Sequence, residues 1–370
     1  MVAFTRTLPI ASVVVALLAA PSAFSQGCIV ARSSTQFSGP ESGGGYMSKG
    51  EFDFSIGLRH QFSFRHFVGD VEQTQRQVIG NQVMNKVNLL NYNLTYQATN
   101  RFSFTVNAPM LLASRRSNNS PYTTTAQGLG DIIVGVQGWI WDPRENSKGN
   151  IQIGLGASLP SGRSDLKNQV DSFNGKGLQD IVLDYSIQPG SGGYGLTLNW
   201  QAFKNLGSTQ TYFNGSYIAT PQNYNNTRRS STSTNVLTMY NSISDQYLLE
   251  AGAAHAVPHI KGLSVSFGPR WEGVPAKDLI GESLGFRRPG FALSLAPGVQ
   301  YIHGRHLFTG TYGRAILRDR TRSVPDRISG GHGDAAFADN LWLASYSFRF
   351  GGRSKNAHAG HAMDVPDNKN

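Results

Sequence analysis

The chain has 370 residues, a formal net charge of +10 and one cysteine, which excludes an intrachain disulfide. Its 42 glycines and 11% aromatic residues are unusual for a soluble helical enzyme of this length. They fit a β-barrel with polar loops and a polar lumen, because only alternate residues of a barrel strand meet lipid.

Residues 1–25 have the composition of a secretory signal peptide. Arg6 supplies the positive start, an apolar segment follows, and a small-x-small cleavage site ends at Ser25. The apolar segment is too short to cross a bilayer as a helix. We therefore expect an exported protein cleaved near Ser25, and export argues against nucleic acid as a partner. Residues 26–49 are predicted to be a flexible periplasmic lead-in, and whether Cys28 is retained or lipidated stays open.

The clearest strand pattern lies between residues 51 and 65. Large apolar side chains such as Phe52 and Phe54 occupy the even positions, and polar residues such as Asp53 and Arg59 occupy most odd positions. A period of two is typical of a β-strand. The segment is longer than the ~5–6 residues of most globular strands and covers the ~9–11 residues of a tilted membrane strand.

Eleven further segments alternate in the same way, with varying clarity. They span residues 90–96, 102–108, 132–140, 151–159, 194–202, 209–219, 245–257, 263–272, 291–301, 306–317 and 341–350. An unpaired sheet edge would leave backbone groups unsatisfied in hydrocarbon. The sequence therefore predicts an all-β fold, a closed antiparallel transmembrane β-barrel of about 12 strands over residues 50–350, with Phe52, Phe54, Leu94, Phe104, Leu196 and Phe348 facing lipid.

The connections between these segments alternate in length. Residues 99–101, 142–149, 205–208, 258–262 and 303–305 form short connections, whereas 66–85, 113–127, 160–192, 220–244, 274–289 and 319–338 form long ones. Outer-membrane barrels have short periplasmic turns and long outer loops. We expect both termini in the periplasm and the long loops outside the cell.

The last predicted strand, residues 341–350, carries Trp342, Tyr346, Phe348 and Phe350 on one face. An aromatic-ended last strand resembles the C-terminal signal by which bacterial outer-membrane barrels are assembled. The resemblance implies a cell outer-membrane location, with membrane lipids and the barrel assembly machinery as partners. The basic net charge makes anionic lipopolysaccharide a further expected partner. Residues 351–370 are predicted to be a disordered periplasmic tail.

Two glycine motifs lie next to each other in the predicted barrel. Gly128-Leu129-Gly130-Asp131 opens one strand, and Gly154-Leu155-Gly156-Ala157-Ser158-Leu159-Pro160-Ser161-Gly162 ends the next. The pair resembles the outer-membrane transporter family named after the meta-pathway of phenol degradation. That resemblance implies a barrel that carries hydrophobic or aromatic compounds, and it names no catalytic residues.

The polar positions of the alternating strands should point into the lumen. The residues predicted to line a solute path are Asp53, Arg59, Asn93, Asn107, Gln152, Arg270, Glu272 and Arg349. Carboxylates and guanidiniums are both present, so we expect many of them to pair across the lumen. The arginines favour small anionic solutes, whereas the family resemblance favours apolar aromatics. Arg287 and Arg288 are predicted to contact an anion from a loop.

We therefore expect a channel or transporter for small solutes, with no catalytic residues, no cofactor and no metal site. A structural or surface-interaction barrel is the first alternative. An outer-membrane lipid hydrolase is the second, with His255 on the lipid face, although the sequence places no outward serine beside it.

Overall fold

The computed structural model describes residues 46–118, 122–146, 148–171, 177–229 and 234–352. The predicted signal peptide, Cys28 and nearly all of the predicted tail and lead-in lie outside the described residues, so their boundaries stay predictions. Within the described ranges, no helix is long and apolar enough to cross a membrane.

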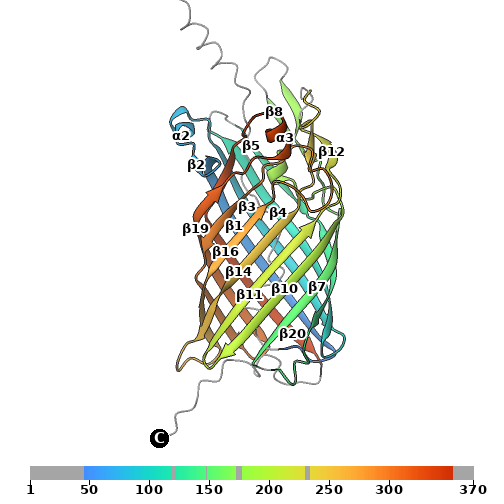
Figure 1. Cartoon of the computed structure of the whole chain (residues 1–370), viewed down its shortest axis with the longest axis vertical. Helices are drawn as coiled ribbons and strands as arrows, with labels where there is room; N and C mark the ends of the chain where they lie inside the picture. Colours follow the sequence, from blue (N-terminus) through green and yellow to red (C-terminus); the bar gives the residue numbers. More distant parts are fainter. Residues whose placement is uncertain (1–45, 119–121, 147, 172–176, 230–233, 353–370) are drawn as a thin grey trace, which may run out of the picture.

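The described residues form a closed antiparallel barrel of twelve strands, which confirms the predicted fold (Figure 1). Closure is made by the first and last strands, which pair from Glu51↔Gly351 to Phe67↔Ala335. In order around the wall the strands are β1 (Glu51–Val68), β3 (Val83–Gln97), β4 (Phe102–Ser117), β5 with β6 (Thr123–Leu129 and Ile132–Trp139), β7 (Gly149–Leu159), β10 (Gly195–Leu206), β11 (Thr209–Ala219), β14 (Gln246–Ala256), β15 with β16 (Leu263–Phe267 and Pro269–Val274), β17 with β18 (Gly290–Leu295 and Gly298–His303), β19 (His306–Asp319) and β20 (Ala335–Gly351).

Three of the wall strands are interrupted, and two of the interruptions have a local cause. Between β5 and β6 the chain lies opposite Pro109 of β4. Pro109 has no backbone N–H to donate to the neighbouring strand, and only its carbonyl bonds there, accepting from Gly130 N (2.7 Å). Between β15 and β16 lies Gly268, where a β-carbon would come within 1.9 Å of the Ala251 carbonyl oxygen. Only glycine fits so close to the neighbouring strand.

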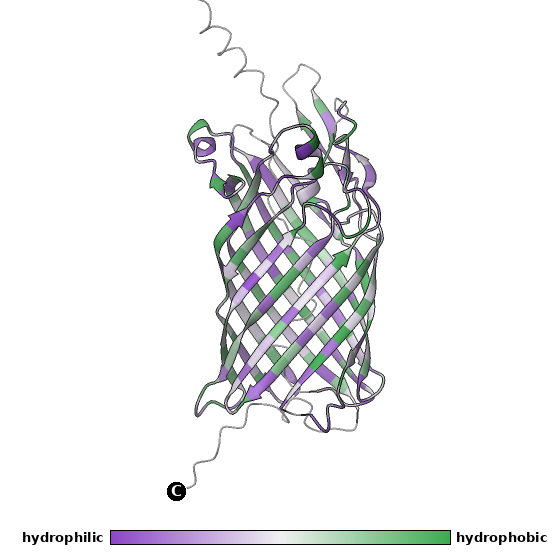
Figure 2. Ribbon diagram, viewed as in Figure 1, coloured by the Kyte–Doolittle hydropathy of each residue, from purple (hydrophilic) through white to green (hydrophobic). Residues whose placement is uncertain are grey.

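The two faces of the wall differ as the alternation predicts. The residues predicted to face lipid point outward, and Phe54, Leu94, Phe104 and Leu196 are 36–60% exposed. Figure 2 shows the resulting alternation of apolar and polar residues along the strands. Inward positions are mostly polar and buried, as in outer-membrane barrels.

Short turns gather at one end of the barrel, here called the turn end, and longer connections at the other, the loop end (Figure 1). The five predicted short turns all lie at the turn end. One expected loop is wrong: most of residues 113–127 is strand, because β4 and β5 stay paired from Met110↔Leu129 to Arg116↔Thr123. The loop end also carries β2 (Val71–Glu72), α2 (Gln75–Ile79), the hairpin of β8 (Lys167–Asp171) and β9 (Leu178–Val182), the turn η2 (Tyr185–Ile187), the hairpin of β12 (Tyr224–Arg228) and β13 (Tyr240–Ser242), and α3 (Val324–Ile328).

Candidate solute path in the barrel lumen

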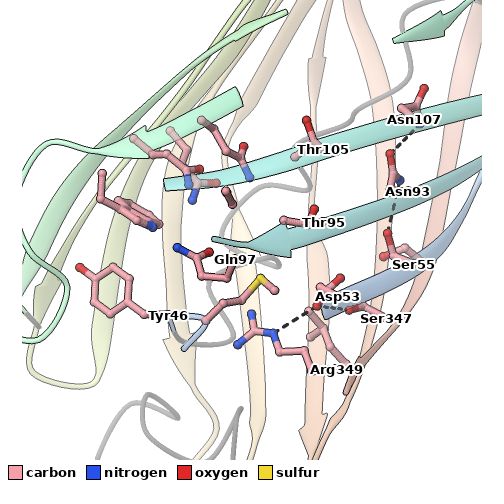
Figure 3. Close-up of a pocket in the computed structure, with 18 residues that line it drawn as sticks. Tyr46, Asp53, Ser55, Asn93, Thr95, Gln97, Thr105, Asn107, Ser347 and Arg349 are labelled. Carbon is pink, nitrogen blue, oxygen red and sulfur yellow. Dashed lines mark hydrogen bonds and ion pairs between the residues drawn. The ribbon is translucent and has the colours of Figure 1, made fainter. Parts of the chain in front are cut away.

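A cavity of about 120 Å³, here called the inner cavity, lies inside the barrel towards the turn end (Figure 3). Its lining comes from strands on several sides of the wall and consists mainly of Ser, Thr, Asn and Gln side chains. Five of the eight residues predicted to line a solute path are brought together here: Asp53, Asn93, Asn107, Gln152 and Arg349.

The charges of the inner cavity cancel each other. Arg349 Nε donates to Asp53 Oδ2 at 3.1 Å, and the Ser347 hydroxyl donates to the same oxygen at 2.7 Å (Figure 3). These residues lie on the paired strands β1 and β20. The cavity therefore presents a neutral surface of amides and hydroxyls, with no uncompensated charge from this pair.

A row of amides crosses the wall of the inner cavity. Asn107 Nδ2 donates to Asn93 Oδ1 (2.6 Å), and Asn93 Nδ2 donates to the Ser55 hydroxyl (3.3 Å) (Figure 3). Among the described residues, Ser103 Oγ, Asn107 Oδ1 and Gln137 Oε1 are buried and have no hydrogen-bond partner. Buried polar atoms normally have hydrogen-bond partners. These three oxygens can therefore accept further hydrogen bonds.

An aromatic group forms another part of the cavity. The rings of Tyr46 and Trp139 meet edge to face with centroids 5.0 Å apart, and Phe203 lies 6.0 Å from each. The Tyr46 hydroxyl donates to the Asn146 carbonyl (2.7 Å) and accepts from Asn150 Nδ2 (3.1 Å). These bonds fix residue 46, just before β1, inside the turn end of the barrel.

A layer of buried charges, here called the central charge layer, crosses the lumen on the loop-end side of the inner cavity. Arg59 donates to Glu272 through both terminal nitrogens (2.6 and 3.1 Å), although three strands separate β1 from β16 around the wall. Arg270 donates to Glu272 (2.9 Å) and also pairs with Glu250. The predicted pairing of inward charges is observed here, and it brings together the remaining three predicted path residues, Arg59, Arg270 and Glu272.

Near the loop end a segment of the connection between β7 and β10 lies inside the barrel. Leu183 and Ile187, which are 4% and 0% exposed, pack against inward residues of β3, β4 and β5. The wall residues of this apolar cluster are Val87, Leu89, Leu111, Ala113 and Ala126. We call residues 183–188 the inserted segment, because they lie against inward-facing residues of the wall.

The inserted segment is held by ions on two sides of the barrel. The Asp184 carboxylate lies 3.4 Å from Arg115 of β4 and 3.4 Å from Arg288, which precedes β17. Ser186 donates to Asp184 through its backbone nitrogen (3.0 Å) and its hydroxyl (2.8 Å). Burial raises the pKa of Asp184, but Arg115 and Arg288 outweigh it and hold the pKa well below the ordinary 3.8. Asp184 is therefore ionised at neutral pH.

The two glycine motifs meet at the base of this connection. Asp131 accepts from the backbone nitrogens of Gly162 (3.1 Å) and Ser191 (2.7 Å), which lie on either side of the inserted segment. At Gly190 a β-carbon would come within 2.1 Å of the Gly162 carbonyl oxygen, so the backbones cross in contact. The motif residues thus tie the two ends of the connection together, a role that the sequence resemblance did not indicate.

The two loop arginines have partners within the chain. Arg287 donates to Asp278 Oδ1 (2.7 Å) and to the Ser242 hydroxyl (2.6 Å), and its side chain is fully buried. Arg288 pairs with Asp184 and lies over the ring of Phe286 (4.5 Å). An anion would have to displace these carboxylates, and the loop anion contact stays a prediction.

The residue predicted for a lipid hydrolase has a hydroxyl neighbour that sequence reasoning missed. His255 Nδ1 lies 2.8 Å from the Thr209 hydroxyl, across the pair β11 and β14.

Within the part of the chain that the structure describes, no three His, Cys, Asp or Glu side chains could hold a metal ion together.

Sequence reasoning also missed Tyr46, Trp139, Leu183, Asp184 and Ile187. Trp139 is at an inward-facing position of its strand, so strict application of the alternation would have predicted that it lines the lumen. The inserted segment and Tyr46 lie outside the regular strand pattern, and only their contacts show where they go.

No protein-family model and no curated protein matches the chain. Among solved structures it is similar to an outer membrane channel from Pseudomonas putida F1, at 13% identity and a TM-score of 0.54, over 82% of this chain and 98% of that one. The fold is that of an outer-membrane β-barrel. At this identity the likeness shows the fold alone.

Two weaker likenesses carry no argument about function. The beta domain of the Bordetella autotransporter Brka has 12% identity and a TM-score of 0.45, over 82% of this chain and 100% of that one. The Ralstonia pickettii toluene transporter TbuX has 10% identity and a TM-score of 0.38, over 82% and 90%. Membership of the phenol meta-pathway family stays a prediction.

Proposed function

We propose that the chain is an outer-membrane channel that passes small solutes through its lumen, with the short turns in the periplasm and the long loops outside. The observation that carries this proposal is the inner cavity, which opens a neutral, hydrogen-bonding space inside the wall. We take the inserted segment and the central charge layer, which lie inside the same wall, as the parts that close this path. Lipopolysaccharide and the barrel assembly machinery stay predicted partners.

The pairing of the lumen charges favours uncharged solutes over small anions. Arg59 and Arg270 share Glu272, and Arg349 is paired with Asp53. A buried guanidinium that already has a carboxylate partner gains little from a passing anion and loses its partner to it. The apolar cluster around Ile187 at the loop end is equally unsuited to ions.

Reconstitution tests the proposed activity directly. In proteoliposomes the protein should take up small uncharged solutes, and planar bilayers should show brief openings, because the path is closed most of the time. A matched protein-free preparation gives the background. If neither conductance nor uptake rises above it, the structural barrel is the better interpretation.

The proposed orientation can be tested with a pair of engineered cysteines in a Cys28→Ser background. Val78→Cys lies in α2 at the loop end, where the residue is 89% exposed, and Ile260→Cys lies in a turn, where it is 50% exposed. A membrane-impermeant maleimide added to intact cells should label only position 78. Labelling of position 260 alone would reverse the orientation.

A further inference from the structure

We infer that the inner cavity is a binding site for small uncharged polyhydroxylated solutes of the size of one monosaccharide ring. This inference rests on the proposed channel function and names its substrate class. It follows from three features of the cavity: its neutral charge, its excess of hydrogen-bonding groups and its aromatic side.

The polar lining suits hydroxyl groups better than ions or hydrocarbon. Asn, Gln, Ser and Thr side chains offer donors and acceptors side by side, and a hydroxyl can use both. An ion would find no free counter-charge in Asp53 and Arg349, which pair with each other. An apolar solute would displace water from these groups without replacing its hydrogen bonds, at a cost of ~1–3 kcal/mol per group.

The unpartnered acceptors lie together on two paired strands. Ser103 of β4 faces Gln137 of β6 in the ladder, and Asn107 follows on the same inward face of β4. All three side chains line the inner cavity, and Ser103 and Asn107 are only 1% and 3% exposed. Hydroxyl donors of a bound polyol would satisfy acceptors that lack a protein partner here.

The aromatic group adds a preference for rings. Trp139 and Tyr46 line the same cavity as the amide row. Aromatic side chains combine a large apolar face with a polar edge, and the C–H faces of a sugar ring are apolar while its rim is polar. At about 120 Å³ the cavity is close to the ~150 Å³ that accommodates a benzene ring. A single ring is therefore the upper limit for the cavity, and a chain of several rings does not fit.

The assignment can be tested by measuring the binding of small solutes to the full chain in detergent. Saturation-transfer NMR titration detects the binding. The probes are glucose, gluconate, which adds a charge at similar size, and benzyl alcohol, which has a ring and one hydroxyl. We expect glucose to bind about tenfold more tightly than either, as one or two additional hydrogen bonds would give. Equal binding of gluconate or benzyl alcohol would overturn the assignment.

Variants locate the site. Asn107→Leu should weaken glucose binding about tenfold, whereas Asn214→Leu, an inward asparagine outside the cavity lining, should leave it within about twofold. Trp139→Leu should weaken glucose binding but not glycerol binding, because only a ring uses the aromatic face. Heat-dependent migration in gels checks that each variant is folded. Equal effects of Asn107→Leu and Asn214→Leu would refute the site.

The outcomes also separate this inference from the channel proposal. If solutes cross the reconstituted protein without any preference for glucose binding, the site assignment fails and the channel stands. If glucose binds as expected but no solute crosses, the channel proposal fails and the binding site stands.

Discussion

Asp184→Asn should open the loop end of the lumen and raise the open probability in planar bilayers at least about tenfold. The substitution removes the charge that holds the inserted segment to Arg115 and Arg288 on two sides of the barrel. Removing one partner of a buried ion pair costs ~3–5 kcal/mol, because the remaining charge stays buried without that partner. Release of the segment relieves that cost, since both arginines then reach water.

The effect should be partial because the apolar cluster also holds the segment. Full burial of a side chain such as Leu183 or Ile187 contributes ~1.5–3 kcal/mol, which is comparable to the ionic contribution. Adding Ile187→Asn to Asp184→Asn should therefore increase the open probability further.

The same connection supplies a matched control. Asp165 pairs with Arg163 at 3.1 Å, but both side chains are at least 60% exposed. Asp165→Asn should leave the conductance unchanged, because exposed ion pairs contribute little. If Asp184→Asn conducts no better than Asp165→Asn, the inserted segment does not control the path.

The pH dependence of closure follows from the direction of the Asp184 shift. A carboxyl whose pKa is lower in the closed state stabilises that state above its ordinary pKa of 3.8, and the stabilisation is lost as pH falls through the lowered value. Between pH 5 and pH 8 this pair should therefore keep the channel closed to the same degree. The open probability should rise only below about pH 4.

Glu272→Gln should have the largest effect on stability and on ion selectivity. Glu272 is the shared partner of Arg59 and Arg270, and the Arg59 and Glu272 side chains are 3% and 11% exposed. Loss of the shared charge should lower the free energy of unfolding by about 3 kcal/mol, measured by urea titration in detergent. The open pore should shift towards anions, because the two guanidiniums of this layer then face a single carboxylate, Glu250.

A second substitution distinguishes charge balance from simple damage to the fold. Arg59→Gln in the Glu272→Gln background removes the one excess positive charge and should restore much of the selectivity and stability. Arg270 keeps its other partner, Glu250. Unchanged anion selectivity in the double variant would show that the central charge layer does not set the field in the pore.

The sequence alone determined the wall of this protein. Alternation with a period of two located β1 and its neighbours and assigned Asp53 to the lumen and Phe54 to the outside, because the direction of a strand side chain is a local property. The short turns were equally local. Closure followed from the requirement that no sheet edge stay unpaired in hydrocarbon.

The tertiary structure decided what fills the lumen. Whether Arg59 meets Glu272 depends on the stagger of strands that lie far apart in the sequence, and a local pattern carries no information about that stagger. Arg287 and Arg288 are predicted to contact an anion from a loop, yet both are buried beside carboxylates. Arg287 pairs with Asp278 of its own connection, and Arg288 pairs with Asp184 of the inserted segment. The inserted segment around Ile187 has no strand period, so only its contacts with β3, β4 and β5 place it inside the barrel, where burial of its apolar side chains and pairing of Asp184 hold it.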